Sequence, residues 1–327
     1  MVANAPRIRF TSDYPPGAVD RLRRQGVLVR VRRGAYAEAG AYEDGRVSEL
    51  LARCRAVHRA LRTAFAFSHE TAAALHGIPT WLERTDKVHI LQTSHPAGNR
   101  ARDVIRHRVV ELPEADLVRT LGLPVTGLDR TCVDCARTQR PGPALSTADA
   151  ILRRLAGTTR FDWPASSARE AQIRAAWLNR VADAGPVRGV VRARAVLSHA
   201  DGRSESAAES LVRWIVLSAG FTAPDLQVGV ATELGTFYPD LLWSGADVHS
   251  EWQMVGLEYD GVAKYTQGSD VYDEKRREDA LRSAGCLIVR ATRADLRDPG
   301  RLLTDLRRHV HASTRLPPER RGLREAD

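Results

Sequence analysis

The most constraining feature of this sequence is an apolar segment that predicts a buried strand and carries an acidic residue. Met254–Tyr259 is mostly apolar, yet Glu258 lies within it and Asp260 follows directly. Because side chains alternate along a strand, both carboxylates are expected on the same face. Isolated carboxylates are costly to bury, so two on one face need a partner. The segment therefore predicts an α/β domain whose sheet holds a charged site.

A divalent cation is the partner that these residue types favour. Mg²⁺ takes oxygen ligands, and Mn²⁺ is the alternative ion. Asp240, on a segment expected to lie alongside, would join Glu258 as a metal ligand. Lys264 or Lys275 would orient an attacking water or offset charge on a phosphodiester. In the structural alternative, the charged run 274–279 is a solvated helical face, and Asp260-Gly261 is a turn.

Five motifs follow one another in the C-terminal third of the chain. They are Ser206-x-x-Glu209-Ser210-x-x-Arg213, Pro239-Asp240, Glu258-Tyr259-Asp260-Gly261, Glu274-Lys275-Arg276-Arg277-Glu278-Asp279-x-x-Arg282 and Gly285-Cys286-Leu287-Ile288-Val289-Arg290. Their order resembles the PD-(D/E)xK nuclease superfamily, and within it the domains similar to very-short-patch-repair endonucleases.

This resemblance implies a restriction-endonuclease-like domain, with a mixed sheet flanked by helices, that cleaves or nicks DNA. It implies that Asp240 and Glu258 bind the metal and that Glu209 reaches the site from its helix. Alternatively, Glu209 and Arg213 simply pair along that helix. The sequence departs from the pattern at Asp260, which stands where the superfamily has a lysine. The nearest substitute is Lys264.

The whole chain has a net charge of +9, and its basic residues concentrate in the N-terminal part. Residues 1–34 contain eight Arg and two Asp, whereas residues 200–312 contain 13 basic and 18 acidic residues. A short helix ending at Arg24 and a basic hairpin over residues 27–37 resemble the second half of a winged helix. Arg30, Arg32 and Arg33 are the predicted DNA-binding residues, although basic residues also simply solvate a surface.

The N-terminal two-thirds carries three further motifs. They are Gly26-Val27-Leu28-Val29-Arg30-Val31-Arg32-Arg33-Gly34-Ala35-Tyr36, Ser68-His69-Glu70-Thr71-Ala72-Ala73-Ala74-Leu75-His76-Gly77 and Arg130-Thr131-Cys132-Val133-Asp134-Cys135-Ala136. Over about residues 8–155 the chain resembles the AbiEi-type antitoxins of the abortive-infection toxin–antitoxin family, which are winged-helix repressors with an α/β effector region. The resemblance implies DNA and a cognate toxin as partners. Only one short helix precedes the wing, so the winged helix is partial.

The fold class expected is multidomain α/β, in five parts. These are a partial winged helix (1–40), an AbiEi-like α/β region (41–156), a helical connector (157–200), a nuclease-like domain (201–312) and a disordered tail (313–327). No apolar run is long enough for a membrane helix, and the N-terminus lacks a signal peptide, so a cytoplasmic protein without a membrane partner is expected.

Two single features favour structural roles. Four cysteines are too few for a disulfide scaffold, and Cys132 and Cys135, an i, i+3 pair on a predicted helix, are expected to be buried thiols rather than zinc ligands. His69 could act as a catalytic base, but its place in the first turn of a helix favours a structural role.

Three functions are consistent with these features. The first is metal-dependent cleavage of DNA, which leaves open whether the chain is an enzyme. The alternative is a non-catalytic DNA-binding regulator of the antitoxin kind. The third is a protein-interaction module with neither activity.

Overall fold

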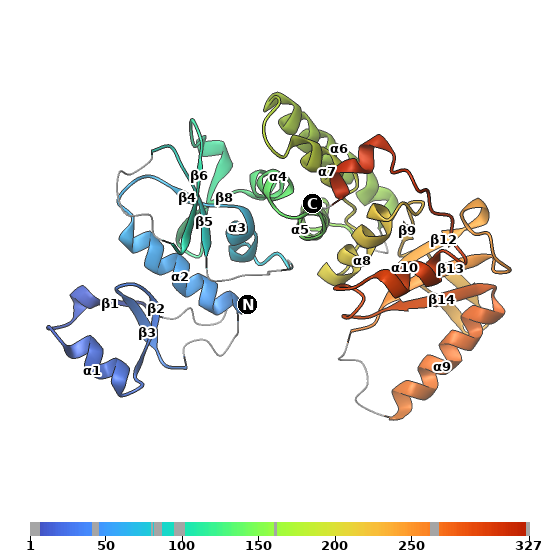
Figure 1. The fold of residues 1–327 in the computed structure, drawn as a ribbon, viewed down its shortest axis with the longest axis horizontal. Coiled ribbons are helices and arrows are strands. Elements are labelled where there is room, and N and C mark those ends of the chain that lie inside the picture. The colour runs from blue at the N-terminus through green and yellow to red at the C-terminus, as the bar shows by residue number, and fades with distance from the viewer. Residues whose placement is uncertain are drawn as a thin grey trace. The chain divides into compact units, whose positions relative to one another are not determined.

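The computed structural model describes residues 7–40, 46–79, 81, 87–94, 102–159, 162–261 and 268–324 of the chain. Within these ranges, helices and four separate sheets make this a mixed α/β protein, which confirms the expected class. The chain divides into two units, Met1–Asp134 and Cys135–Asp327, and each is described by itself (Figure 1).

The N-terminal unit begins with a small sheet in the order β1-β3-β2. Strands β2 and β3 form an antiparallel hairpin with a register shift between Arg30 and Arg32. Gly34 in the connecting turn has a φ of +77°, a left-handed conformation that glycine adopts without strain. The elements of this part are β1 (Arg9–Phe10), η1 (Thr11–Asp13), α1 (Ala18–Arg24), β2 (Leu28–Arg32) and β3 (Ala35–Glu38).

Helix α2 (Arg46–Ala60) is buried on two opposite faces. Ala52 and Ala56 pack against the small sheet, in a cluster with Val31. Leu50, Leu51, Cys54 and Val57 pack into a second, larger core. At 100° per residue these two sets lie on opposite sides of the helix. The helix therefore belongs to both cores of the N-terminal unit.

The second core of this unit lies against a five-stranded sheet with the order β6-β5-β4-β8-β7. Strands β5 and β6 are parallel, as are β4 and β8, and the remaining pairs are antiparallel. Helix α4, which contains Cys132 and Cys135 as two buried thiols, leads out of this unit. The elements are β4 (Ala66–Phe67), α3 (His69–Leu75), β5 (Val88–Gln92), β6 (Val104–Arg108), η2 (Glu114–Asp116), β7 (Leu117–Thr120), β8 (Leu123–Thr126) and α4 (Leu128–Thr138).

The C-terminal unit begins with a group of helices that pack on one another. Helix α5 contacts α6, α7 and α8, and Trp177 and Val181 of α6 are fully buried. The segment expected to be a connector is thus part of a helical layer with its own interior. Its helices are α5 (Pro141–Ala156), α6 (Trp163–Asp183), α7 (Val190–Ser198) and α8 (Ala207–Ser218).

A four-stranded mixed sheet with the order β14-β13-β12-β9 completes the C-terminal unit. Strands β13 and β14 are parallel and joined through α9, while β12 is antiparallel to both its neighbours. Helices α8 and α10 cover one face and α9 covers the other (Figure 1). The elements are β9 (Asp225–Leu226), β10 (Val230–Thr232), β11 (Gly235–Phe237), β12 (Leu241–Ser244), η3 (Gly245–Asp247), β13 (Met254–Tyr259), α9 (Gly268–Ser283), β14 (Cys286–Ala291) and α10 (Gly300–Leu306).

Residues 313–324, part of the tail expected to be disordered, are packed against the helical layer. This segment forms η4 (Pro318–Leu323), and Leu323 is fully buried. The Leu323 carbonyl accepts a hydrogen bond of 2.7 Å from Trp214 Nε1. At Gly322 a Cβ atom would come within 2.5 Å of the Val191 carbonyl oxygen, so glycine permits the close approach to α7. A buried leucine and this close contact hold the segment in place.

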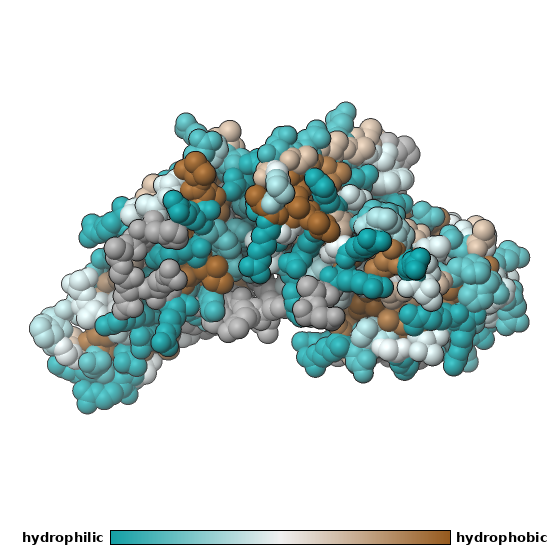
Figure 2. Space-filling view, turned by 45° about the horizontal axis from the view of Figure 1, so that its top comes forward, coloured by the Kyte–Doolittle hydropathy of each residue, from teal (hydrophilic) through white to brown (hydrophobic). Residues whose placement is uncertain are grey.

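Hydrophilic side chains cover most of the surface that Figure 2 shows, with apolar patches between them. Within the described ranges, none of the helices has the length and apolarity needed to span a bilayer.

Candidate functional site

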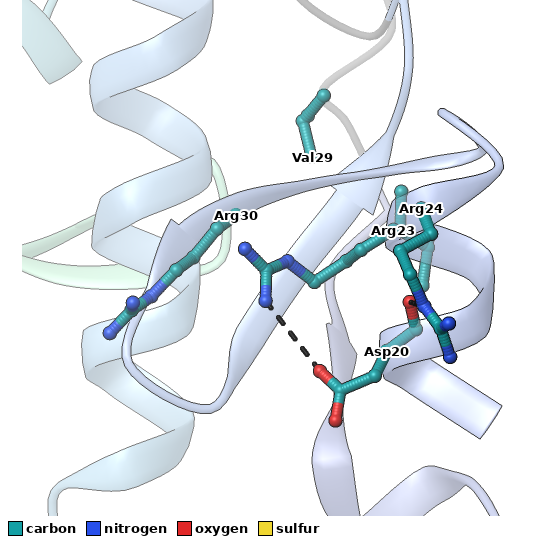
Figure 3. Close-up of a pocket in the computed structure, with 6 residues that line it drawn as sticks. Asp20, Arg23, Arg24, Val29 and Arg30 are labelled. Atoms are coloured by element: carbon teal, nitrogen blue, oxygen red, sulfur yellow. Dashed lines mark hydrogen bonds and ion pairs between the residues drawn. The ribbon is translucent and has the colours of Figure 1, made fainter. Parts of the chain in front are cut away.

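Arginines of α1 and β2 line an open groove on the N-terminal unit. The Arg23 and Arg24 side chains come from α1, and Arg30 comes from β2 (Figure 3). All three are exposed. Leu28 and Val29 also line this groove. We call Arg23, Arg24 and Arg30 the groove arginines.

Among the described residues, one acidic side chain, Asp20, also lines the groove. Its Oδ1 atom lies 3.6 Å from Arg23 Nη1, and both side chains are largely exposed. Such a solvated pair holds its partners weakly. Arg24 donates to the Asp20 backbone carbonyl at 3.4 Å. Among the described residues, neither Arg24 nor Arg30 has a carboxylate partner, so the groove keeps a net positive charge.

The three arginines predicted to bind DNA have different environments. Arg30 and Arg33 are exposed. Arg32, by contrast, is held by Asp103: its Nε lies 2.8 Å from Asp103 Oδ2, and its Nη2 donates to Oδ1 at 3.2 Å. Only 12% of the Arg32 side chain is exposed. Arg32 therefore holds the hairpin in place and does not face solvent as Arg30 does.

The acidic residues predicted to bind metal lie at the α9 face of the C-terminal sheet. Asp240 Oδ2 accepts a hydrogen bond of 2.9 Å from the Tyr259 backbone N–H, which ties it to the neighbouring strand. Both oxygens of Glu258 accept from Arg277 of α9, the longer contact being 3.1 Å. This paired geometry is the strong form of an arginine–carboxylate interaction.

Asp260 belongs to the same set of ion pairs. Its Oδ2 lies 3.3 Å from Arg290 Nη1. Glu274 joins the two halves, because it accepts from Arg277 at 3.0 Å and also contacts Arg290. The carboxylates of Glu258, Glu274 and Asp260 thus alternate with two guanidinium groups. We call these five residues the arginine–carboxylate network.

The two guanidinium groups of this network supply positive charge beside the carboxylates. From the sequence, a metal cation was expected to supply that charge. Among the described residues, the side chains with donor atoms close enough to share one ion are His69, His89 and His107. Lys275 is exposed on α9, and Lys264 lies outside the described residues. A metal on Asp240 and Glu258 stays a prediction, and the contacts of Glu258 do not favour it.

Glu209 has a local role at the start of α8. Ser206 is the N-cap, and its Oγ accepts from the Glu209 backbone N–H at 3.2 Å. The Glu209 carboxylate in turn accepts from the Glu205 backbone N–H at 2.8 Å. This reciprocal arrangement resembles a capping box, displaced by one residue. Burial raises the pKa of Glu209, although hydrogen bonds to its carboxylate from the Glu205 backbone and the Ser206 side chain oppose the effect.

Arg213 pairs with a different acid from the one that helical spacing suggested. Its Nη2 donates to both Asp149 oxygens at 2.7 Å, and both side chains are almost completely buried. Nη1 donates to the His199 carbonyl at 2.7 Å. Burial raises the pKa of Asp149 in spite of this partner. In the motif from Ser206 to Arg213, the serine therefore caps helix α8, and the arginine joins this helix to Asp149 of α5.

Arg23 and Arg24 were not among the residues predicted to bind DNA. Both precede the hairpin by only a few residues, in the helix of the partial winged helix. Two adjacent arginines at the end of that helix were the available signal, and the fold places them beside Arg30 (Figure 3).

Comparison with known proteins adds independent evidence for part of the chain. Residues 64–199 match the family described as the AbiEi antitoxin C-terminal domain. An uncharacterized protein of Mycobacterium tuberculosis, called Rv2248 in strain H37Rv and MT2308 in strain CDC 1551, is 31% identical over 289 residues. That alignment covers 88% of this chain and 94% of the mycobacterial protein. The chain belongs to the family of these mycobacterial proteins.

The AbiEi match includes β4 to β8 and the helices α3 to α7. It supports the AbiEi-type resemblance over residues 64–155, where the match and the predicted resemblance overlap. The predicted resemblance to PD-(D/E)xK nucleases has no support from these similarities and stays a prediction. The crystal structure of the Rv2827c protein from Mycobacterium tuberculosis covers 60% of this chain and 77% of its own, with 17% identity and a TM-score of 0.31. A TM-score this low does not establish a common fold.

Proposed function

We propose that this protein is a non-catalytic DNA-binding regulator of the antitoxin kind, the alternative that the sequence left open. The observation that carries the proposal is the groove formed by Arg23, Arg24 and Arg30 (Figure 3). The AbiEi antitoxin domain over residues 64–199 supports it.

The groove has the chemistry that a DNA backbone requires. Guanidinium groups bind phosphate oxygens in forked geometry, and each neutralised phosphate releases counterions. Arg33, exposed at the tip of the hairpin, extends the basic surface beyond the groove. Contacts of this kind position a protein on the duplex without selecting a sequence. We therefore assign affinity, rather than sequence preference, to the groove arginines.

A cognate toxin is the second partner in this proposal. The support for it is the family description, since an antitoxin acts on a toxin. The matched region begins after the hairpin. We therefore assign DNA binding to the basic hairpin and toxin binding to the AbiEi region.

The test is DNA binding by the full chain, measured by fluorescence anisotropy with a duplex from its own promoter. We expect the logarithm of the affinity to fall linearly with the logarithm of salt concentration. Replacing Arg23, Arg24 and Arg30 by Ala should lower the affinity at least about tenfold and flatten the salt slope by roughly 0.9 for each lost phosphate contact.

A matched control removes the same charge elsewhere. Arg276, Arg293 and Arg297 are exposed in the C-terminal unit. Their triple alanine variant should bind DNA with nearly the affinity of the unmodified chain. Equal losses in the two triple variants, or binding that salt does not weaken, would refute the role of the groove.

Metal-dependent cleavage is not part of this proposal. Its predicted ligand Glu258 is held by Arg277, which already supplies that carboxylate with a positive partner. If the chain nicked plasmid DNA in the presence of Mg²⁺ and Asp240→Asn abolished the nicking, the cleavage function would again be supported.

A further inference from the structure

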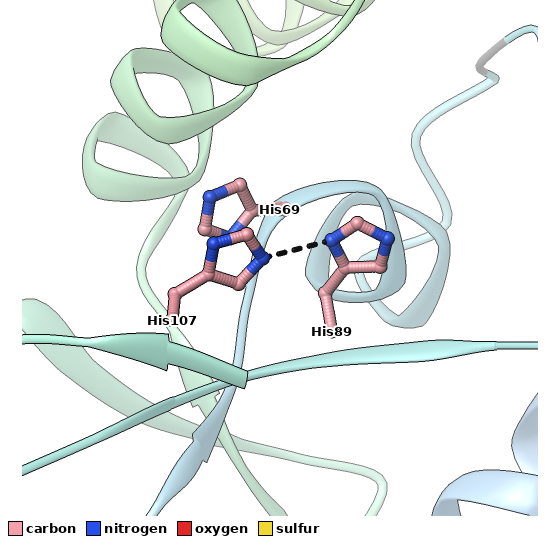
Figure 4. A group of neighbouring side chains, drawn as sticks. All are labelled: His69, His89 and His107. Atoms are coloured by element: carbon pink, nitrogen blue, oxygen red, sulfur yellow. Dashed lines mark hydrogen bonds between the residues drawn. The ribbon is translucent and has the colours of Figure 1, made fainter. Parts of the chain in front are cut away.

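Three histidines from separate elements meet in the N-terminal unit. His69 is the first residue of α3, His89 lies on β5 and His107 lies on β6 (Figure 4). In the parallel pair of β5 and β6, His89 is opposite Ile105, and His107 is opposite Leu91. This register makes the two histidines diagonal neighbours on one face of the sheet. A backbone hydrogen bond from Ser68 N–H to the His89 carbonyl brings the start of α3 beside them.

The ring nitrogens are close enough to act together. Each histidine offers one nitrogen, and these atoms lie within 4.8 Å of one another. His89 Nδ1 and His107 Nε2 are 3.1 Å apart. Two nitrogens bound to one tetrahedral Zn²⁺ at about 2.0–2.1 Å are separated by roughly 3.4 Å. The spacing of this pair is therefore close to that of two ligands of one ion.

The far nitrogens of two rings are met by side-chain oxygens. Glu70 Oε2 lies 3.2 Å from His89 Nε2, which directs His89 Nδ1 toward His107. Ser68 Oγ lies 2.9 Å from His69 Nδ1. Histidines that bind metals characteristically use their second nitrogen in this way, and the carboxylate fixes the tautomer that leaves a lone pair for the ion.

The backbone at His69 is also unusual. Its φ is +54°, in a region that residues other than glycine rarely adopt, and its side chain is buried. A buried non-glycine residue held there stores strain, and such strain concentrates at functional sites. The conformation places the His69 ring on the His107 ring, with a centroid separation of 3.7 Å.

We propose that His69, His89 and His107 form a binding site for Zn²⁺, with Glu70 as the carboxylate that orients His89. Imidazole nitrogens favour Zn²⁺ over Mg²⁺, whose ligands are oxygens. Three protein ligands leave one tetrahedral position for an exogenous ligand. Stacked rings aim their nitrogens side by side, so the His69 ring turns about its side-chain torsions when the ion binds. The site does not depend on the proposed DNA binding.

The test uses the full chain stripped of metal and titrated with Zn²⁺ by calorimetry, with metal content measured after dialysis. We expect one Zn²⁺ per chain, bound at micromolar concentration or below. Replacing both His89 and His107 by Gln should lower the affinity more than about 100-fold, because two ligands are lost. Glu70→Gln keeps all three ligands and should lower it about 10- to 100-fold.

A matched control comes from the C-terminal unit, where His249 and His311 lie with ring centroids 4.5 Å apart. Their double Gln variant should bind Zn²⁺ as the unmodified chain does. Co²⁺ gives a readout that requires no variant to fold: the unmodified chain should develop the visible absorption of tetrahedral Co²⁺, and one equivalent of Zn²⁺ should abolish it. No stoichiometric binding, an octahedral Co²⁺ spectrum, or equal losses in the two double variants would overturn the proposal.

Discussion

Arginine has opposite roles around the groove of the N-terminal unit and in the ion pairs of the C-terminal unit. Around the groove, Arg24 and Arg30 face solvent, and among the described residues no carboxylate pairs with either. In the C-terminal unit, Arg213 and Arg277 are held by the carboxylates of Asp149 and Glu258. The amount of positive charge in a segment therefore does not decide whether it binds anions. What decides is whether the fold has already provided each guanidinium with a partner.

The largest expected effect concerns an arginine that pairs with a buried carboxylate. Arg213→Ala leaves the Asp149 carboxylate buried without its partner, which should lower the free energy of unfolding by about 3–5 kcal/mol. Urea denaturation measures the loss, and Arg297→Ala, at an exposed position, should change the value by less than about 0.5 kcal/mol. A loss below about 1 kcal/mol would show that the pair is not important for stability.

The second prediction compares two arginines of the same strand. Arg32→Ala removes the partner of Asp103 and should lower the free energy of unfolding by about 1–3 kcal/mol. Arg30→Ala should leave stability nearly unchanged and instead weaken DNA binding. Denaturation and anisotropy on both variants separate the two effects. If Arg32→Ala weakened DNA binding more than Arg30→Ala without loss of stability, the assignment of the two roles would be reversed.

A third, smaller effect concerns pH. Burial would raise the pKa of Asp201, but the hydrogen bonds from Arg203 and the charges of Arg213 and Arg203 outweigh it and lower the pKa. A depressed carboxyl pKa stabilises the fold above the unfolded value, about 3.9. This contribution disappears as the pH falls through the lower folded value. The stability difference between the unmodified chain and Asp201→Asn should shrink as denaturation is repeated from pH 7 toward pH 3; a constant difference would contradict it.

The smallest expected effect is the response to Mg²⁺. A resident ion on Asp240 and Glu258 would stabilise the fold by about 2.7 kcal/mol at 100 times its dissociation constant. Because Arg277 already holds Glu258, we expect no shift in thermal midpoint at millimolar Mg²⁺. A rise in the thermal midpoint that Asp240→Asn removes would contradict this expectation, because it would show that these acidic residues can bind a cation.

Much of the local structure could be predicted from the sequence. The strand Met254–Tyr259 has the expected bounds, and the helix expected to end at Arg24 ends there. Both follow from local sequence patterns, which are a property of neighbouring residues. The burial of Cys132 and Cys135 followed from their i, i+3 spacing on a helix.

The partners of charged side chains could not be predicted in the same way. Arg277 is 19 residues from Glu258, and Arg32 is 71 residues from Asp103. Such pairs depend on sheet register and on helix packing, which local patterns do not specify. Three motif residues were also open to a simpler interpretation. The spacing Ser206-x-x-Glu209 before an apolar run is the signature of a helix cap. Arg213 pairs with a buried carboxylate in the core.

Helix α2 has a mechanical consequence for the N-terminal unit. One side of it supports the strands that carry Arg30, and the other side supports the sheet that carries His89. Close-packed interiors transmit displacement rather than absorb it. Because both cores pack on this one helix, a shift of α2 from one side would displace side chains on the other side.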